Sequence, residues 1–140
     1  MDLAQAMEHV KSTRNGTLVT HRRDGRAQLS NIIYAVGDDG VIRISITADR
    51  AKAKNLERDP RAELYVAGDN HWKFVVLDAD AELSPVSAAP DDATVEELIA
   101  IYRAMVGEHP NWDEYRDAMV SDQRLVARLR PTRAVGLWRE

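Results

Sequence analysis

The sequence predicts a mainly β domain of the α+β class, in which six antiparallel strands close into a small barrel that carries short helices. Most of the chain consists of short β-prone runs separated by glycine-containing turns. One run, 41–47, alternates strictly between apolar and polar residues, as expected for a strand with one buried face. The chain has 140 residues, of which 44% are apolar, and we expect residues 1–140 to form a single domain. A closed barrel would also leave no sheet edge exposed.

The first half of the chain is expected to hold one helix and two hairpins. Asp2 is a candidate N-cap for a helix over 2–12, whose apolar residues recur at helical spacing. Three β-prone runs follow, at 17–22, 27–36 and 41–47, and the turn signals between them are Asp24-Gly25 and residues 37–40. In the third run one face is expected to join the core: Ile42, Ile44 and Ile46.

The second half alternates between helices and strands. Residues 51–58 predict a two-turn helix that ends at Asp59-Pro60, because a residue before proline avoids the α region. Strands are expected at 62–66 and 71–83, with Trp72, Phe74 and Val76 on one apolar face and a bulge or bend near residues 77–78. Two helices should follow, one capped by Asp92 or Thr94 and one by Asn111, before a last strand over 124–138.

Composition excludes several functional classes. The chain lacks cysteine, which removes thiol catalysis and Cys-ligated metal sites, and no two of the four histidines have metal-ligand spacing, so no metal is expected. No apolar run is long enough to span a membrane and no signal peptide is evident, so we expect a cytoplasmic protein. A formal net charge of −4 argues against bulk nucleic-acid binding.

The charges are distributed unevenly along the chain. Basic residues concentrate in 11–27 and 43–61, whereas 78–114 contains ten acidic residues against Arg103 alone. This distribution favours a small anionic ligand near the basic half, and the alternative is a set of solvated faces of mixed charge.

The densest polar cluster, residues 47–56, lies where a strand runs directly into a helix. The start of a helix offers unpaired N–H groups, and Arg50 and Lys52 add positive charge at the same place. Asn55 lies one turn after Lys52 on the same face. The pattern predicts a phosphate site, and the alternative is a solvated cationic helix that pairs with Glu57 and Asp59.

Four segments resemble one known family. They are DGRAQLSN at 24–31, RAKAKNLERDPR at 50–61, APDD at 89–92 with the helix after it, and GEHPNWD at 107–113. Together they resemble the split β-barrel superfamily of flavin- and deazaflavin-binding proteins typified by pyridoxamine 5′-phosphate oxidase, of the FMN-binding split-barrel type. The insertion around GEHP is similar to that of the B-type, actinobacterial oxidoreductases that use coenzyme F420.

The resemblance implies a set of cofactor-binding residues. Arg50 and Lys52 would hold the phosphate, with Asn55 beside them. One strand would line the deazaflavin ring with Ser45, Ile46 and Thr47, and the neighbouring strand with Gln28, Ser30 and Asn31. Trp72 of the partner subunit would close one side of the pocket. It also implies a homodimer with the site at the subunit interface.

The expected function is an oxidoreductase that binds F420 and transfers a hydride to a conjugated organic acceptor. The cofactor would carry the chemistry, so no catalytic side chain is assigned. Two alternatives stay open: an FMN-dependent enzyme like pyridoxamine-phosphate oxidase, and a non-catalytic carrier of F420 or flavin. Pyridoxamine-phosphate oxidation is disfavoured because the chain ends at Glu140 without the Arg-rich C-terminal segment of that enzyme.

Overall fold

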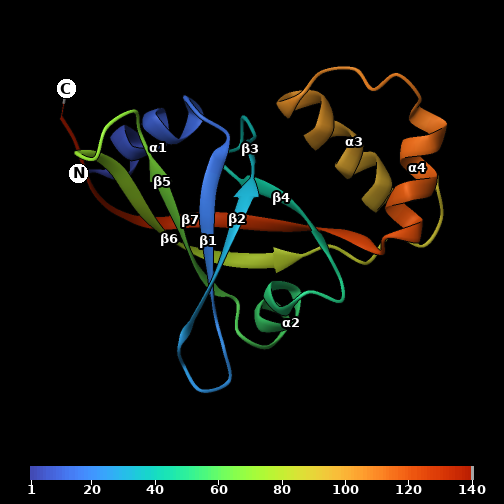
Figure 1. Cartoon of the computed structure of the whole chain (residues 1–140), viewed down its shortest axis with the longest axis horizontal. Coiled ribbons are helices and arrows are strands. Elements are labelled where there is room, and N and C mark those ends of the chain that lie inside the picture. Colours follow the sequence, from blue (N-terminus) through green and yellow to red (C-terminus); the bar gives the residue numbers. More distant parts are fainter. Residues whose placement is uncertain (140) are drawn as a thin grey trace.

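The computed structural model describes residues 1–139, and within them one antiparallel sheet carries four helices (Figure 1). The helices are α1 (Leu3–Lys11), α2 (Ala51–Arg58), α3 (Ala93–Met105) and α4 (Trp112–Ser121). The strands are β1 (Asn15–His21), β2 (Ala27–Ile33), β3 (Ala35–Val36), β4 (Ile42–Thr47), β5 (Arg61–Ala67), β6 (Lys73–Leu83) and β7 (Arg124–Trp138). The mainly β class is confirmed.

The sheet corrects the predicted six-stranded closed barrel. Its strand order is β2-β1-β5-β6-β7-β4-β3, so the described chain has seven strands in a curled half-barrel with β2 and β3 at the edges. The additional strand arises because the expected run 27–36 is divided at Tyr34. The Tyr34 side chain is 1% exposed, and its hydroxyl donates to the Val10 carbonyl at 2.7 Å. This inward turn separates β2, which pairs with β1, from β3, which pairs with β4.

Helix ends follow the sequence signals closely. Asp2 forms a capping box with Gln5, Asp92 accepts from the Val95 N–H, and Asn111 accepts from the Glu114 N–H. α2 ends at Asp59, the residue before proline, as expected. These local hydrogen bonds fix where the helices begin and end, independently of the sheet.

The inner face of the sheet packs against α1 and α2. Alternate residues of the strands are buried there, and the three isoleucines of β4 are at most 1% exposed, as the alternation predicts. α2 contributes Ala53 and Leu56 to this core, and α1 contributes Ala6 and Val10. Burying this apolar surface is the main stabilisation of the fold.

The predicted orientation of β6 is wrong in its first half. The buried residues are Val75, Leu77 and Ala79, so Phe74 and Val76 face the opposite side of the sheet. The register does shift between Asp78 and Ala79, but the extra residue lies in β7, so β6 alternates without interruption. Residues 74–77 are apolar on both faces, so periodicity alone does not reveal which face is inside.

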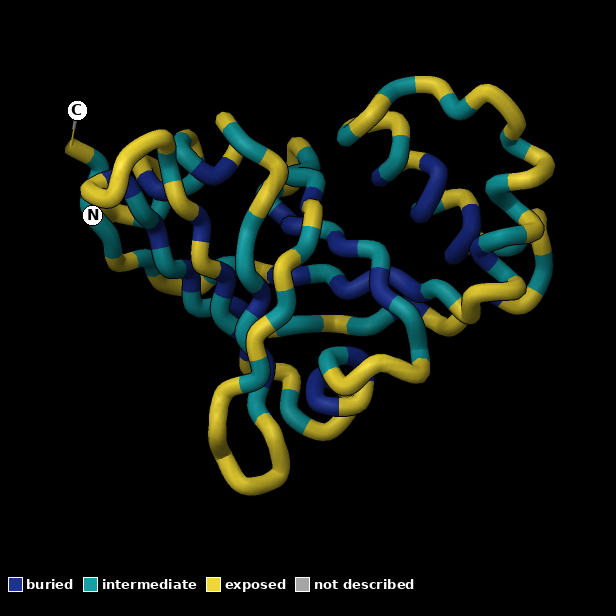
Figure 2. The backbone as a smooth tube through the Cα atoms, in the orientation of Figure 1, coloured by how far each residue is buried: buried dark blue, intermediate teal, exposed yellow. Residues whose placement is uncertain are grey.

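The outer face of the sheet has two parts. Over β4 and the first half of β7, α3 and α4 cover it and bury Val126 with Val95, Leu98 and Ile99. Figure 1 shows the two helices side by side over this part, and Figure 2 shows α3 alternating between buried and exposed residues. We call this part the covered face.

Over β2, β1, β5, β6 and the end of β7, no helix of the described chain covers the outer side, and we call this part the open face. A continuous cross-strand row of residues runs across it, and these are Asn31, Thr17, Tyr65, Val76 and Val135. Several large apolar side chains are exposed here: Leu29 at 61%, Ile33 at 49%, Tyr65 at 40% and Val135 at 40%. Several exposed large apolar residues on one sheet face are typical of an interaction surface.

Candidate functional site

A groove of about 420 Å³ lies between the edge strand β2 and strand β4, and we call it the β2–β4 groove. It reaches from the start of α2 to the end of α3. Its lining residues are Asn31, Ile32, Ile33, Ser45, Ile46, Thr47, Arg50, Lys52, Met105 and Arg124. Six of the ten predicted cofactor-binding residues therefore lie together in one groove: Asn31, Ser45, Ile46, Thr47, Arg50 and Lys52.

Two of the three cations of the groove lie at the start of α2: Arg50 at its N-cap and Lys52 in its first turn. β4 ends at Thr47, and Arg50 takes the N-cap position of α2 with an extended backbone. No side chain caps this helix, and its first turn contains no acidic residue. The first N–H groups of α2 and the side chains of Arg50 and Lys52 are therefore available to an anion in the groove.

The third cation, Arg124, is one that sequence reasoning missed. It is the first residue of β7 and pairs with Thr47 in the register of β4 and β7. Gln123 before it has a φ of +54°, and its carbonyl accepts from the Ala48 N–H at 3.0 Å. The turn into β7 thus lies against the turn into α2. No sequence signal reveals this proximity, because it depends on the pairing of two strands far apart in the chain.

The three cations lack, among the described residues, the carboxylate partners that Arg43 and Arg128 of the same sheet have. Among residues 1–139, no ion pair involves Arg50, Lys52 or Arg124. Burial, followed by the charges of Arg50 and Arg124, lowers the pKa of Lys52. A bound anion would reduce the repulsion between Lys52 and these two arginines, so their proximity favours anion binding.

The opposite end of the groove is apolar. Ile32 and Ile33 of β2 and Met105 at the end of α3 line it. Arg14 donates a hydrogen bond to the Met105 carbonyl and so ties the last turn of α3 to the segment before β1. The groove is therefore cationic at one end, polar along Asn31, Ser45 and Thr47, and apolar at the other end. This arrangement suits an elongated ligand with an anionic tail and a planar, partly apolar ring.

The other four predicted site residues lie outside the groove of the single chain, and these are Gln28, Ser30, Asn55 and Trp72. Gln28 bonds to the neighbouring side chains of Thr20 and Ser30. Asn55 is 7% exposed, donates to the Thr20 hydroxyl at 3.1 Å and accepts from Arg58 at 3.1 Å, so it fastens α2 to β1. Trp72 is 60% exposed in the loop between β5 and β6.

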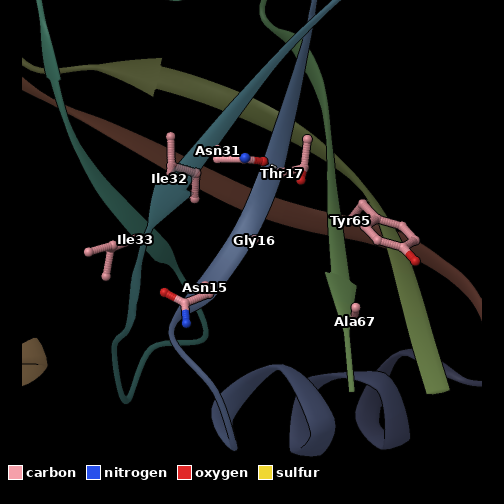
Figure 3. A pocket seen from close by; sticks show the side chains of 8 residues that line it. All are labelled: Asn15, Gly16, Thr17, Asn31, Ile32, Ile33, Tyr65 and Ala67. Carbon is pink, nitrogen blue, oxygen red and sulfur yellow. Dashed lines mark hydrogen bonds between the residues drawn. The ribbon is translucent and has the colours of Figure 1, made fainter. Parts of the chain in front are cut away.

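A second hollow on the open face adjoins the groove (Figure 3). Its volume is about 510 Å³, and it shares Asn31, Ile32 and Ile33 with the β2–β4 groove. The Thr17 hydroxyl donates to Asn31 Oδ1 at 3.0 Å across its floor. A Cβ at Gly16 would lie 3.0 Å from the Leu64 side chain and 3.1 Å from the Tyr65 carbonyl, so a side chain at this position would crowd its neighbours. The candidate site is thus continuous with the exposed sheet surface.

The described residues show neither a metal site nor a membrane span. No group of three or more His, Cys, Asp or Glu side chains in residues 1–139 lies close enough together to hold a metal ion. None of the described helices combines the length and the apolar character that crossing a bilayer requires.

The described residues thus form a curled antiparallel half-barrel sheet with a cationic groove beside its edge strand. The family model of pyridoxamine 5′-phosphate oxidase matches residues 3–136. The chain therefore belongs to this family.

Solved structures with the same fold include proteins of different function. A conserved hypothetical protein, Rv2991 from Mycobacterium tuberculosis, is 28% identical over 96% of this chain and 82% of its own length, with a TM-score of 0.72. An F420 reductase is 24% identical over 91% of this chain and 94% of its own, with a TM-score of 0.64. An FAD-binding protein from Mesorhizobium loti is 16% identical over 96% of this chain and 90% of its own, with a TM-score of 0.66. The last two likenesses show the fold alone.

Proposed function

We propose that the protein is an oxidoreductase of the B-type, F420-dependent kind, which binds coenzyme F420 in the β2–β4 groove and transfers a hydride to a conjugated organic acceptor. The observation that carries this proposal is the set of cations without carboxylate partners at one end of a groove whose other end is apolar. The anionic tail of F420 matches the first end and its planar ring matches the second. The match of the chain to its family supports the choice of a flavin-type cofactor.

The residues of the chain would bind and orient this cofactor. Arg50 and Lys52 would hold its phosphate by charge-assisted hydrogen bonds. Ser45 and Thr47 would offer hydroxyl groups to the ring edge, and Met105 would shield the ring from water. When bound, the reduced deazaflavin supplies the hydride. The main contribution of the protein would be to hold ring and acceptor in contact, which raises their effective concentration.

We also propose that two chains form a homodimer through the open face. The exposed apolar residues of this face would be buried by a second copy, and the hollow in Figure 3 joins them to the groove. Trp72 is exposed, and a partner would place it beside the cofactor, as the resemblance implies. The site would then be complete only in the dimer.

The experiment that tests the cofactor is a pair of fluorescence titrations of the purified protein, with F420 and with FMN, at identical salt. Micromolar or tighter binding of F420 with weak binding of FMN supports the proposal. The reverse preference makes the protein a flavin enzyme, and binding of neither contradicts the proposal. Tight F420 binding without turnover of enone, quinone or tetrapyrrole acceptors would instead identify a carrier.

The placement of the phosphate is tested by Lys52→Ala. Loss of a charge-assisted bond should weaken F420 binding by about 1.5 to 3 kcal/mol. Lys11→Ala removes the same charge from the last turn of α1, where Lys11 pairs with Glu8 at 3.8 Å, and should leave the affinity unchanged. An unchanged affinity in Lys52→Ala would refute the placement of the site.

A further inference from the structure

On the covered face, the arginines of β4 and β7 differ in one respect. Arg43 contacts Glu97 at 3.1 Å and Asp39 at 2.9 Å. Arg128 contacts Glu97 at 2.6 Å and Glu82 at 2.7 Å. Arg124 lies on the same side of β7 as Arg128, four residues earlier, yet no carboxylate of the described chain pairs with it. Among residues 1–139, its charge is therefore uncompensated.

The polar atoms of the Arg124 side chain are also incompletely bonded. Its Nε is buried and has no hydrogen-bond partner in the part of the chain that the structure describes. Its Nη1 lies 3.4 Å from the Ser45 carbonyl oxygen and 3.5 Å from the Ser45 hydroxyl, which are long distances for an N–H···O bond. An unsatisfied buried donor on a charged group is costly unless something else binds it. Because Arg124 lines the β2–β4 groove, a ligand in that groove is in a position to do so.

The backbone of Arg124 is held independently of its side chain. Its carbonyl accepts from the Ser87 N–H at 2.8 Å and from the Ser87 hydroxyl at 2.7 Å. The carbonyl of Gln123 accepts from Ala48, as described above. These bonds hold the start of β7 beside the start of α2, so the backbone from which the Arg124 side chain extends keeps its place whether or not the guanidinium group has a partner.

We propose that Arg124 is a third ligand of the anion in the β2–β4 groove and, with Arg50 and Lys52, makes the site specific for a phosphate group. Arg50 and Lys52 approach from the start of α2, whereas Arg124 approaches from β7. Cations from two elements, together with the free N–H groups of α2, surround a tetrahedral oxyanion more completely than a planar carboxylate. The identity of the ligand rests on the proposed function, but the role of Arg124 does not.

The test is a double-mutant-type cycle of binding affinities, in which the Arg124 side chain and the phosphate of the ligand are removed separately and together. Arg124→Gln and wild-type protein are titrated with FMN and with riboflavin, and with F420 and the corresponding deazaflavin lacking the phosphate. We expect Arg124→Gln to weaken binding of the phosphate-bearing ligand by on the order of 10- to 100-fold and to leave the dephosphorylated ligand unaffected. Equal affinities in both proteins, or equal losses for both ligands, would overturn the proposal.

Two further variants serve as controls. Arg130→Gln makes the same change on the same strand, at an exposed residue outside the groove, and should behave as wild type. Arg124→Lys keeps the charge but loses the planar set of guanidinium N–H donors. It should recover part of the affinity that Arg124→Gln loses. If Arg124→Lys binds no better than Arg124→Gln although both retain wild-type circular dichroism, charge at this position is not what the ligand recognises.

A measurement without any cofactor separates this proposal from the proposed function. The melting temperature is followed in inorganic pyrophosphate and in chloride at equal ionic strength. We expect pyrophosphate to stabilise the wild type and Arg130→Gln, but to stabilise Arg124→Gln much less. If this holds and neither F420 nor FMN binds, the anion site stands and the cofactor assignment fails. If pyrophosphate does not stabilise the wild type, or stabilises Arg124→Gln equally, the proposal fails.

Discussion

The covered and open faces are two parts of one side of the same sheet, but apolar residues are buried on the covered face and exposed on the open face. On the covered face, α3 and α4 bury the apolar residues, and Arg43 and Arg128 are paired with carboxylates. On the open face, Leu29 and Val135 remain exposed to solvent. The β2–β4 groove lies at the boundary, with β4 on the covered side and β2 on the open side. The α3–α4 pair therefore buries one part of this side of the sheet in the protein core and leaves the other part available to partners.

The largest effect expected from this comparison is on stability. Leu98 is fully buried on the covered face and Leu29 is 61% exposed on the open face, so Leu→Ala makes the same chemical change in two environments. We expect Leu98→Ala to lower the free energy of unfolding by about 2 to 5 kcal/mol and Leu29→Ala by less than about 1 kcal/mol. Urea denaturation measures both, at a protein concentration low enough to dissociate the proposed dimer. Similar losses would mean that the open face is already buried against a partner under those conditions.

The next effect is on association. Replacing both Leu29 and Val135 by Asp should convert the proposed dimer to a monomer, because charged groups would be buried without partners, at a cost of at least about 2 kcal/mol. Analytical ultracentrifugation measures the change. Val86→Asp alters an equally exposed apolar residue in the loop before α3 and should leave the dimer intact. A dimer that survives the double substitution must use another surface.

A smaller effect concerns the ion pairs of the covered face. Hydrogen bonds from Arg128, with a smaller contribution from Arg43, lower the pKa of Glu97 from its usual value near 4.5. The stabilisation is therefore present above pH 4.5 and is lost as the pH falls through the lowered pKa of the folded state. Glu97→Gln should cost about 1 to 2 kcal/mol at pH 7 and should remove this part of the acid dependence. Urea denaturation from pH 7 to pH 3 checks both, and a variant with the wild-type pH profile would contradict the assignment.

The smallest effect is on the pH dependence of binding in the groove. Because the pKa of Lys52 is lowered from 10.5, phosphate-bearing ligands should lose affinity, by about severalfold, at a pH below the ordinary lysine range. Arg50→Gln removes one of the charges responsible, so this alkaline loss should move to higher pH. Titrations with F420 between pH 7 and pH 10 measure the shift. A shift to lower pH would mean that Arg50 does not act on Lys52 through its charge.

Some features of the site were predictable from the sequence because they are local. Arg50 and Lys52 lie together since they belong to one strand-to-helix connection, and Ser45 and Thr47 share a face because of strand alternation. Arg124 and Met105 were not predictable. They lie 74 and 55 residues after Arg50 and reach the groove through the pairing of β7 with β4 and the packing of α3.

The sequence alone predicts the helix caps at Asp2 and Asn111, the end of α2 before Pro60, and the buried face of β4, and it narrows the cap of α3 to Asp92 or Thr94. The choice of Asp92, the break at Tyr34, the orientation of β6 and the coverage of the outer face are visible only in the folded structure. The two groups differ in the sequence separation of the contacts on which they depend. Caps and alternation depend on hydrogen bonds and side-chain directions within a few residues, whereas strand register and helix coverage depend on contacts between segments far apart in the chain.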